Sequence, residues 1–249
     1  MSRSFIHGWN PDVPDHRDHA YPRVAKPAAL PAKIDLRPKM PPVFDQGTLG
    51  SCTANAIGGA LAFLHVQEGL GDLLPSRLFI YYNERAREGT VRTDAGAQLR
   101  DGIKSVNAQG ACEESLWPYD IAKFARKPLA KCYVEAKKHI AVSYQRLSSL
   151  NGFRACLSEG YPVAFGFSVS ETFEGPKVAR TGILPMPEPK ERILGGHAVL
   201  AVGYDDAKER LLVRNSWGAD WGLKGYFWMP YGYITEGLAD DFWTIRMVK

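Results

Sequence analysis

A cysteine that can act as a nucleophile stands in the stretch FDQGTLGSCTANA, Phe44 to Ala56. A thiol attacks a carbonyl only as its thiolate, and the pKa of a free cysteine lies near 8.5, so a nucleophilic Cys52 needs groups that lower this pKa. A helix N-terminus and a neighbouring imidazolium are two such groups. A lone cysteine is more often an inert core residue, so the residues around Cys52 must decide between the two interpretations.

His197 is the histidine best placed to act as a base for Cys52. It follows two glycines and opens a predicted strand, where an imidazole has room to project. Asn215 lies on the next predicted strand, and antiparallel neighbours place such residues side by side, where an asparagine orients the imidazole. The other histidines have ordinary surroundings. The pair His16 and His19 is expected to be solvated, and we predict no metal site.

Two groups near Cys52 are candidates to stabilise the oxyanion that forms when a thiolate attacks a carbonyl. The backbone N–H of Cys52 is the first, because it lies at a predicted helix N-terminus. The side-chain amide of Gln46 is the second, because the glycine-containing loop after it can fold back on Cys52. Trp217 and Trp221 are placed to shield the base from water, although core packing is the ordinary role of a buried tryptophan.

The elements that must position these residues change in character along the chain. Apolar residues at helical spacing from Ile57 predict a helix that begins at Ser51, and Gly58 and Gly59 within it indicate a closely packed neighbour. Two more helices are expected, near 76–87 and 98–109. Strands are expected at 161–169, 197–206, 210–217, 225–230 and 240–248. This order predicts an α+β fold of two lobes, with an active site in the cleft between them.

The composition excludes several classes of protein. The 249 residues carry a formal charge of +4 from dispersed basic residues, so nucleic-acid binding is not expected. There is no apolar run of about 18 residues, so no membrane span is expected, and no motif indicates a cofactor. No secretory signal is visible, which leaves a cytoplasmic location or a non-classical export route open. Cys112 and Cys132 are close enough in sequence to pair, and two reduced thiols are an equal alternative.

Gln46, Cys52, His197, Asn215 and Trp217 together resemble the papain-like cysteine proteases. The stretch QGTLGSCT resembles the family pattern around the nucleophile, GGHAVLAVGYD the histidine region and RNSWGADWGLKGYFWM the asparagine region. His197 lies 145 residues after Cys52, within the family spacing of about 130 to 150. The resemblance covers roughly residues 30–249. It implies a papain-like α+β fold with a helical lobe and an antiparallel β-barrel-like lobe.

The resemblance also implies a role for each of these residues. Cys52 would be the nucleophile, and His197 would hold the proton as imidazolium and later donate it to the leaving amine. Asn215 would orient His197, and Trp217 would cover that contact. Gln46 and the backbone amide of Cys52 would form the oxyanion hole.

The substrate-binding residues are inferred from the same resemblance. The stretch DAGAQ corresponds to the family's substrate-binding glycine segment, so Ala95 and Gly96 would line one wall. Gly166 and Gly196 would border the main specificity pocket, and two glycines there predict a roomy, apolar pocket without a charged selector. Trp221 would bound the leaving-group side, next to Trp217.

Two substitutions depart from the family pattern. Leu49 stands where the family has a cysteine, so a disulfide typical of secreted members is lost, which fits a reducing compartment or a bacterial member. Thr53 replaces the aromatic residue that follows the nucleophile. This change leaves catalysis possible and alters the packing at the cleft.

The N-terminal residues 1–29 are rich in Pro, Asp, Arg and His and are expected to be extended. They stand where the family has a long prodomain. We therefore expect three parts: an N-terminal segment 1–29, a mainly helical lobe 30–120 with Cys52, and a mainly β lobe 121–249 with His197 and Asn215. The segment is long enough to cross the cleft and hold the enzyme latent as a zymogen. A disordered tail, or a segment packed elsewhere, is the alternative.

The function expected from these features is that of a cysteine endopeptidase, which hydrolyses peptide bonds in peptides or proteins through a thioester acyl-enzyme. A different thiol acyl-transfer enzyme, such as a deamidase, transglutaminase or ligase, would use the same groups. An inactive peptide-binding relative is a third alternative, which the intact set of Gln46, Cys52, His197 and Asn215 disfavours.

Overall fold

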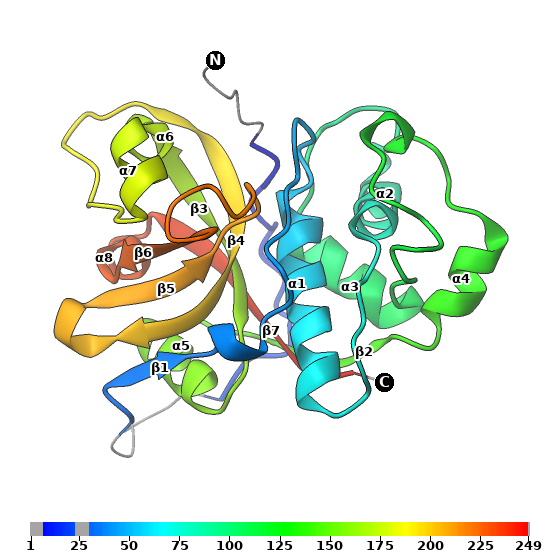
Figure 1. Cartoon of the computed structure of the whole chain (residues 1–249), viewed down its shortest axis with the longest axis horizontal. Helices are drawn as coiled ribbons and strands as arrows, with labels where there is room; N and C mark the ends of the chain where they lie inside the picture. The colour runs from blue at the N-terminus through cyan, green and yellow to red at the C-terminus, as the bar shows by residue number, and fades with distance from the viewer. Residues whose placement is uncertain (1–6, 23–29, 249) are drawn as a thin grey trace.

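Helix α1 (Cys52–Gln67) begins at Cys52 and runs between the two halves of the molecule (Figure 1). Its residues from Cys52 to His65 are all buried, because helices pack on one side of it and a sheet on the other. A Cβ atom at Gly59 would lie 3.3 Å from the side chain of Leu200 in the sheet. Gly59 therefore lets the sheet approach α1 closely, and the prediction of a tightly packed neighbour is confirmed at this glycine.

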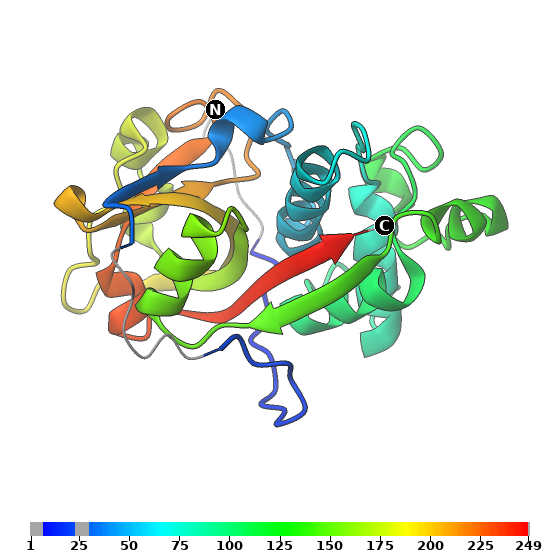
Figure 2. The ribbon, with the colours of Figure 1, turned by 90° about the horizontal axis from the view of Figure 1, so that it is seen from below.

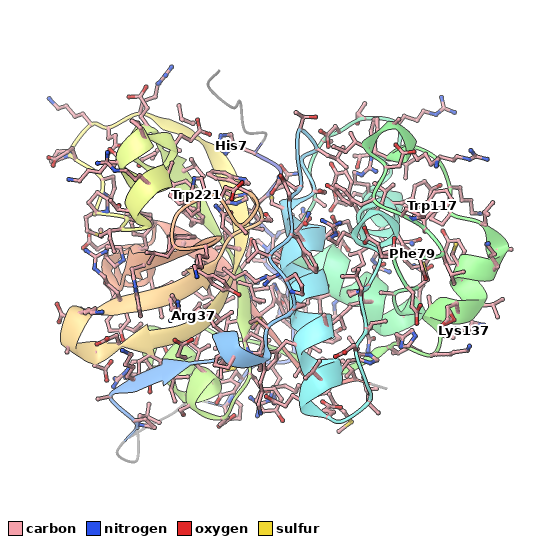
Figure 3. The ribbon with its side chains drawn as sticks, viewed as in Figure 1. His7, Arg37, Phe79, Trp117, Lys137 and Trp221 are labelled. Carbon is pink, nitrogen blue, oxygen red and sulfur yellow. The ribbon has the colours of Figure 1, made fainter. Side chains whose placement is uncertain are left out.

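This computed structural model describes residues 7–22 and 30–248. The helical lobe contains α1, α2 (Arg77–Glu88), α3 (Leu99–Gln109) and α4 (Ala130–Ala136). Ser76 caps α2, since its side chain accepts a hydrogen bond from the backbone N–H of Phe79, as a serine at an N-cap position does. Figure 3 shows Phe79 and Trp117 within this lobe. Cys112 and Cys132 are buried here as free thiols.

The second lobe is built on a seven-stranded antiparallel sheet. Its strands are β1 (Lys33–Asp35), β2 (Ala141–Arg146), β3 (Val163–Ser170), β4 (Ile193–Asp205), β5 (Arg210–Arg214), β6 (Tyr226–Pro230) and β7 (Ala239–Val248). The order is β2-β7-β3-β4-β5-β6, and β1 pairs with β4. Short helices accompany the sheet: α5 (Leu150–Ser158), α6 (Glu171–Glu174), α7 (Pro176–Thr181) and α8 (Gly232–Thr235). Figure 2 shows β2 and β7 extending from this lobe toward the helical one.

Alternation along the central strands separates the two faces of the sheet. On β4, Leu200 and Val202 belong to the core shared with the helices, whereas Val199 and Ala201 belong to the core on the opposite face. Successive side chains of a strand point to opposite faces, so this pattern follows directly from the sequence. His197 shares the face of Val199 and Ala201, and Gly196 shares the opposite face.

The two-lobed α+β prediction is confirmed, with two refinements. The sheet is open and is not closed into a barrel, because β2 and β6 end the path of hydrogen-bonded strands without pairing with each other. His197 lies within β4, which begins at Ile193, and does not open the strand. The division at residue 120 stays a proposal, since α4 beyond it lies on the helical side (Figure 1).

Part of the N-terminal segment runs along the boundary between the lobes, where its residues hydrogen-bond to both (Figure 1). Residues 7–22, which we call the strap, are described, and the remainder of the segment 1–29 lies outside the described residues. None of the helices in the described parts of the chain has the length and apolar character needed to cross a bilayer.

Candidate active site

Cys52 is the first residue of α1 and is completely buried. The backbone amides of Thr53, Ala198 and Gly8 hydrogen-bond to its sulfur and favour the thiolate. Thr53 belongs to the helix N-terminus, where unpaired N–H groups and the helix dipole favour an anion. Ala198 belongs to β4, and Gly8 belongs to the strap. Three separate segments therefore meet at the Cys52 sulfur.

His197 is oriented by Asn215. The Nε2 atom of the imidazole lies 2.8 Å from Asn215 Oδ1, and both residues are buried. The same oxygen accepts a hydrogen bond of 2.8 Å from the backbone N–H of Ser216. Because this oxygen accepts from Ser216 and can only accept, Nε2 carries the proton. The other nitrogen, Nδ1, is buried and has no hydrogen-bond partner, so its lone pair is available to take a proton.

Aromatic rings enclose the imidazole of His197. Trp217 stacks on it at a centroid distance of 4.9 Å and an interplanar angle of 26°. Phe167 meets it edge-on at 5.9 Å, and Trp221 packs at right angles on Trp217 at 5.3 Å. Trp217 thus covers the imidazole directly and Trp221 packs behind Trp217, and both also contribute to the core of the sheet lobe.

Gln46 lies in the loop before Cys52 and is buried. Its side-chain oxygen accepts a hydrogen bond of 2.6 Å from the hydroxyl of Ser216, and its Nε2 donates one of its two hydrogens to Leu49 O at 2.9 Å. Ser216 follows Asn215 directly, so Gln46 joins the loop before the nucleophile to the strand end that carries Asn215. An amide nitrogen carries two hydrogens, so Nε2 can donate to one further acceptor.

The titration of Cys52 and His197 reflects their complete burial. Desolvation raises the pKa of the Cys52 thiol to about 12, and desolvation also lowers the pKa of His197 to about 4. Removal from water disfavours the charged form of each group, so burial under the strap opposes the thiolate–imidazolium pair expected from the sequence.

The strap lies in an extended conformation between the two walls of the cleft and forms backbone hydrogen bonds to both. On the sheet side, Trp9 N donates to Gly196 O at 3.1 Å. On the helical side, Asn10 N donates to Ala97 O at 3.0 Å, and Ala97 N donates to Gly8 O at 2.8 Å. Ala97, which follows the predicted wall residues Ala95 and Gly96, therefore carries two backbone hydrogen bonds to the strap.

The wall residues Ala95 and Gly96 also lie against the strap. Ala95 O accepts a hydrogen bond of 2.9 Å from the side-chain amide of Asn10. Gly96 has a φ of +70°, and a Cβ atom there would lie 2.2 Å from Gly8 O. A glycine is required at this position because both the backbone conformation and the close approach of the strap exclude a side chain.

The indole of Trp9 fills the space beside the two pocket glycines. A Cβ atom would lie 1.9 Å from the Trp9 ring if built on Gly166, and 2.5 Å from it if built on Gly196. At the inner end of this space, Trp9 Nε1 donates to Asp241 Oδ2 at 3.0 Å. The glycines do make the pocket roomy. The expectation that it lacks a charged group is wrong, because β7 brings in a carboxylate that no local sequence signal marks.

Charged residues fasten the strap beyond the pocket. Asp12 accepts hydrogen bonds from Arg100 N at 3.0 Å and from Trp243 Nε1 at 2.8 Å. Asp18 forms ion pairs with Arg100 at 2.6 Å and with Arg146 at 3.1 Å. Arg100 belongs to the helical lobe and Arg146 to the sheet lobe. The two aspartates of the strap therefore bind to both lobes at once.

Thr53, one of the two departures from the family pattern, follows Cys52 on α1. The hydroxyl of Thr53 donates to Glu84 Oε1 at 2.6 Å, and both residues are buried. Desolvation raises the pKa of Glu84 well above its ordinary value. Thr53 thus satisfies a buried carboxyl group of α2, which an aromatic residue at this position would not do.

One group of potential metal ligands occurs among the described residues. Glu113, Glu135 and His139 place one potential ligand atom each within 4.8 Å of one another. The ring of His139 packs at a tilt against that of His65, near the C-terminal end of α1, whereas Cys52 is at its N-terminal end. His139 Nε2 already lies 3.2 Å from Glu135 Oε1. We assign no metal to this group, and it is separate from the cleft.

Sequence analysis missed several residues that the structure brings to the cleft. Gly8, Trp9, Asn10, Ala97 and Asp241 all belong to this set. The two glycines flanking the pocket were a usable signal for a bulky occupant. Nothing in the local sequence identified Trp9 as that occupant, because the strap and the pocket lie more than 150 positions apart in the chain.

The cleft lies between a helical lobe and an antiparallel sheet. It holds a cysteine at the start of a helix and a histidine oriented by an asparagine, and this combination defines a thiol protease. The chain belongs to the papain family of cysteine proteases, and the family model described as papain family cysteine protease matches residues 30–242. The resemblance noted in the sequence is therefore confirmed.

Individual relatives agree with this assignment. The chain is 42% identical to xylellain, a cysteine protease from Xylella fastidiosa, with a TM-score of 0.91 over 100% of this chain and 98% of that chain. It is 45% identical to an uncharacterized peptidase C1-like protein of Acanthamoeba polyphaga mimivirus, over 90% of this chain and 77% of the viral protein. It is 30% identical to the thiol protease aleurain of Arabidopsis thaliana, over 85% of this chain and 59% of aleurain.

Proposed function

We propose that this chain is a cysteine endopeptidase in which Cys52 is the nucleophile and His197 the acid–base group. The observation that carries the proposal is the hydrogen bonding of the two imidazole nitrogens of His197. Asn215 binds its Nε2 at 2.8 Å, and its Nδ1 is buried without a partner. The strand residue that follows His197 donates its backbone N–H to the Cys52 sulfur. An oriented base with one unused nitrogen beside a helix-start thiol is what nucleophilic acyl transfer needs.

The chemical steps follow from this arrangement. The Cys52 proton passes to Nδ1 of His197, and the thiolate attacks the carbonyl carbon of the scissile peptide bond. The carbonyl electron pair moves to oxygen, where the Cys52 amide and Gln46 Nε2 are the donors for the oxyanion. The C–N bond then breaks, and the imidazolium gives its proton to the leaving amine. Water, deprotonated by His197, attacks the thioester, which releases the acid and restores the thiol.

Hydrolysis of peptide substrates tests the proposal against other acyl transfer. We expect the chain to cleave internal peptide bonds, and Cys52→Ala to abolish cleavage. Mass spectrometry of a slowly hydrolysed ester should show a covalent adduct on Cys52. If an added amine captures the acyl group and no hydrolysis occurs even without amine, the chain is a transferase and the endopeptidase proposal fails.

We further propose that the strap holds the enzyme latent. Its support is the contact at Gly8, whose amide hydrogen-bonds to the Cys52 sulfur. A Cβ atom at Gly8 would lie 1.8 Å from Gly50 O, in the backbone before the nucleophile. Only glycine fits there, so Gly8→Val removes the strap from the catalytic end of the cleft. We expect Gly8→Val to hydrolyse peptides faster than the unmodified chain.

The substrate-binding residues and the source of the chain are also proposals. We propose that Ala95, Gly96, Gly166 and Gly196 line the substrate cleft, with Trp217 and Trp221 on the leaving-group side. The strap occupies the surface that a substrate would use, which supports the first four assignments. A bacterial source is also proposed, supported by the likeness to a bacterial protease.

A further inference from the structure

A carboxyl group is buried next to the first turn of α1, the turn that carries the nucleophile. Glu84 reaches this turn from α2, and its Oε1 accepts a hydrogen bond of 2.6 Å from the hydroxyl of Thr53. Both residues are completely buried. Helix α3 closes over the same group, because a Cβ atom at Gly102 would lie only 2.6 Å from Glu84 Oε2. Three helices thus enclose a carboxyl group to which the catalytic steps assign no role.

The surroundings of Glu84 favour its neutral form. Its Oε2 is buried without a hydrogen-bond partner, so Thr53 is the only donor to this carboxyl group in the described part of the chain. Arg85 is next in the chain, but its guanidinium donates to backbone carbonyl oxygens. Burial raises the pKa of Glu84 well above its ordinary value, the carboxyl groups of Glu88 and Asp101 also raise it, and Arg85 lowers it. Because a buried charge with one neutral donor is costly, Glu84 keeps its proton.

Thr53 connects this carboxyl group to the nucleophile. Its backbone N–H hydrogen-bonds to the Cys52 sulfur, and its hydroxyl bonds to Glu84. The hydroxyl contact fixes Thr53 in the first turn of α1, and so fixes the direction of the N–H that favours the thiolate. A charge on Glu84 would act in the opposite sense. Burial is the main cause of the raised pKa of Cys52, and a negative Glu84 raises this pKa further.

We propose that Glu84, in its neutral form, is a positioning residue for Cys52 that acts through Thr53. The neutral carboxyl accepts from the Thr53 hydroxyl and holds the first turn of α1, and it places no second negative charge beside the thiolate. This pairing is a feature of this chain at a position where the family pattern has an aromatic residue. The inference rests on the proposed function, in which the Cys52 thiolate is the nucleophile.

The pH dependence of Cys52 alkylation tests the proposal, and it reports on the thiolate whether or not a peptide is cleaved. The full-length chain carrying Gly8→Val is the parent, treated with iodoacetamide between about pH 3 and pH 9, and peptide mapping locates the label. Thr53→Val removes the hydroxyl and keeps the shape of the side chain. We expect it to raise the midpoint of the labelling curve by at least about half a pH unit, because the thiolate loses part of its hydrogen bonding.

Conservative and control variants separate positioning from general stability. Thr53→Ser and Glu84→Gln each keep a neutral donor–acceptor pair, so each should rescue the midpoint to within about 0.2 units of the parent. Thr244→Val is the matched control, because Thr244 is also completely buried and donates its hydroxyl to Pro162 O at 3.1 Å, in the sheet lobe. It should leave the midpoint in place even where it lowers Tm as much as Thr53→Val does.

The possible outcomes distinguish this role from the proposed function. An unshifted midpoint in Thr53→Val, or an equal shift in Thr244→Val, would overturn the positioning role and leave the protease proposal standing. A midpoint in Glu84→Gln at least about half a unit below the parent would show that Glu84 is charged, and would overturn the role in the same way. An ordinary thiol titration of Cys52 near about pH 8.5 in every form would overturn both.

Discussion

At the scale of single residues, Cys52 and His197 show that the surroundings of a side chain can shift its pKa far from the ordinary value of that residue type. The helix start and three backbone amides favour the thiolate of Cys52, yet complete burial raises its pKa to about 12. Sequence analysis could find Cys52, His197 and Asn215, because their types and order carry the chemistry. The shift of their pKa values by burial was not predictable, since this desolvation depends on the strap that covers them.

Asn215 provides the residue-scale prediction. In the Gly8→Val background, Asn215→Ala should lower kcat by roughly 5- to 150-fold, because the buried Nε2–H of His197 then lacks an acceptor at a cost of about 1–3 kcal/mol. Steady-state hydrolysis of a peptide measures this. Asn107→Ala is the control, since that asparagine bonds to Ala141 O outside the cleft, and its kcat should not change. An unchanged kcat in Asn215→Ala would show that His197 needs no such partner.

At the scale of elements, the packing of α1 on β4 determines where the nucleophile sits. The long helices and the central strands were predictable, because their apolar residues repeat at 3.6 or 2.0 positions. The elements β2, α4 and α5 were not predicted; β2, for example, is only half-buried along most of its length, so its sequence lacks a clear apolar alternation. The carboxylate of Asp241 was missed for a related reason. Its left-handed φ of +57° interrupts the alternation of β7, and sequence does not reveal such a residue.

Two glycines on α1 provide the element-scale prediction. Gly59→Val should lower the free energy of unfolding by about 1–3 kcal/mol, because a Cβ atom there already lies 3.3 Å from Leu200 Cδ2, and the extra methyls overpack the interface. Gly58→Ala should raise it by up to about 1 kcal/mol, since its Cβ has ordinary contacts at 3.4 Å and alanine favours the helix. Urea denaturation measures both. Destabilisation of similar size in the two variants would contradict the close approach at Gly59.

At the scale of the whole molecule, the strap joins the two lobes through its carboxylates. The backbone N–H of Asp12, on the strap, donates a hydrogen bond to Asp241. Asp12 also accepts from Arg100 and Trp243, and Asp241 accepts from Arg146. Desolvation raises the pKa of Asp12, and desolvation together with Asp12 raises the pKa of Asp241 to about 7. The composition of the strap predicted that it would be extended. The place where it docks was not predictable, because its partners are distant in sequence.

The pH dependence of latency follows from these raised pKa values. At Asp241 the docked state holds its proton more tightly than the released one, so this contribution to docking is fully present below the ordinary aspartate pKa near 4 and is lost as pH rises through about 7. His197 has the opposite effect between about pH 4 and 6.5, because burial under the strap lowers its pKa to about 4. The ratio of kcat/KM between the unmodified chain and Gly8→Val should therefore rise by roughly two- to fourfold from pH 6.5 to pH 8, above the range in which His197 opposes it. Taking the ratio cancels the pH profile of the chemistry itself. A ratio that is flat or falls with pH would exclude this linkage.

Labelling of Cys52 tests the central claim, a catalytic thiol covered by the strap, most directly. A peptide-like epoxide is added at about pH 5.5, where an ordinary thiol is only about one part in a thousand ionised, and peptide mapping locates the label. Gly8→Val should label at Cys52 at least about tenfold faster than the unmodified chain. Val13→Ala, an exposed change on the same strap, should label like the unmodified chain. Equal labelling of the unmodified chain and Gly8→Val, or labelling at another cysteine, would contradict the account.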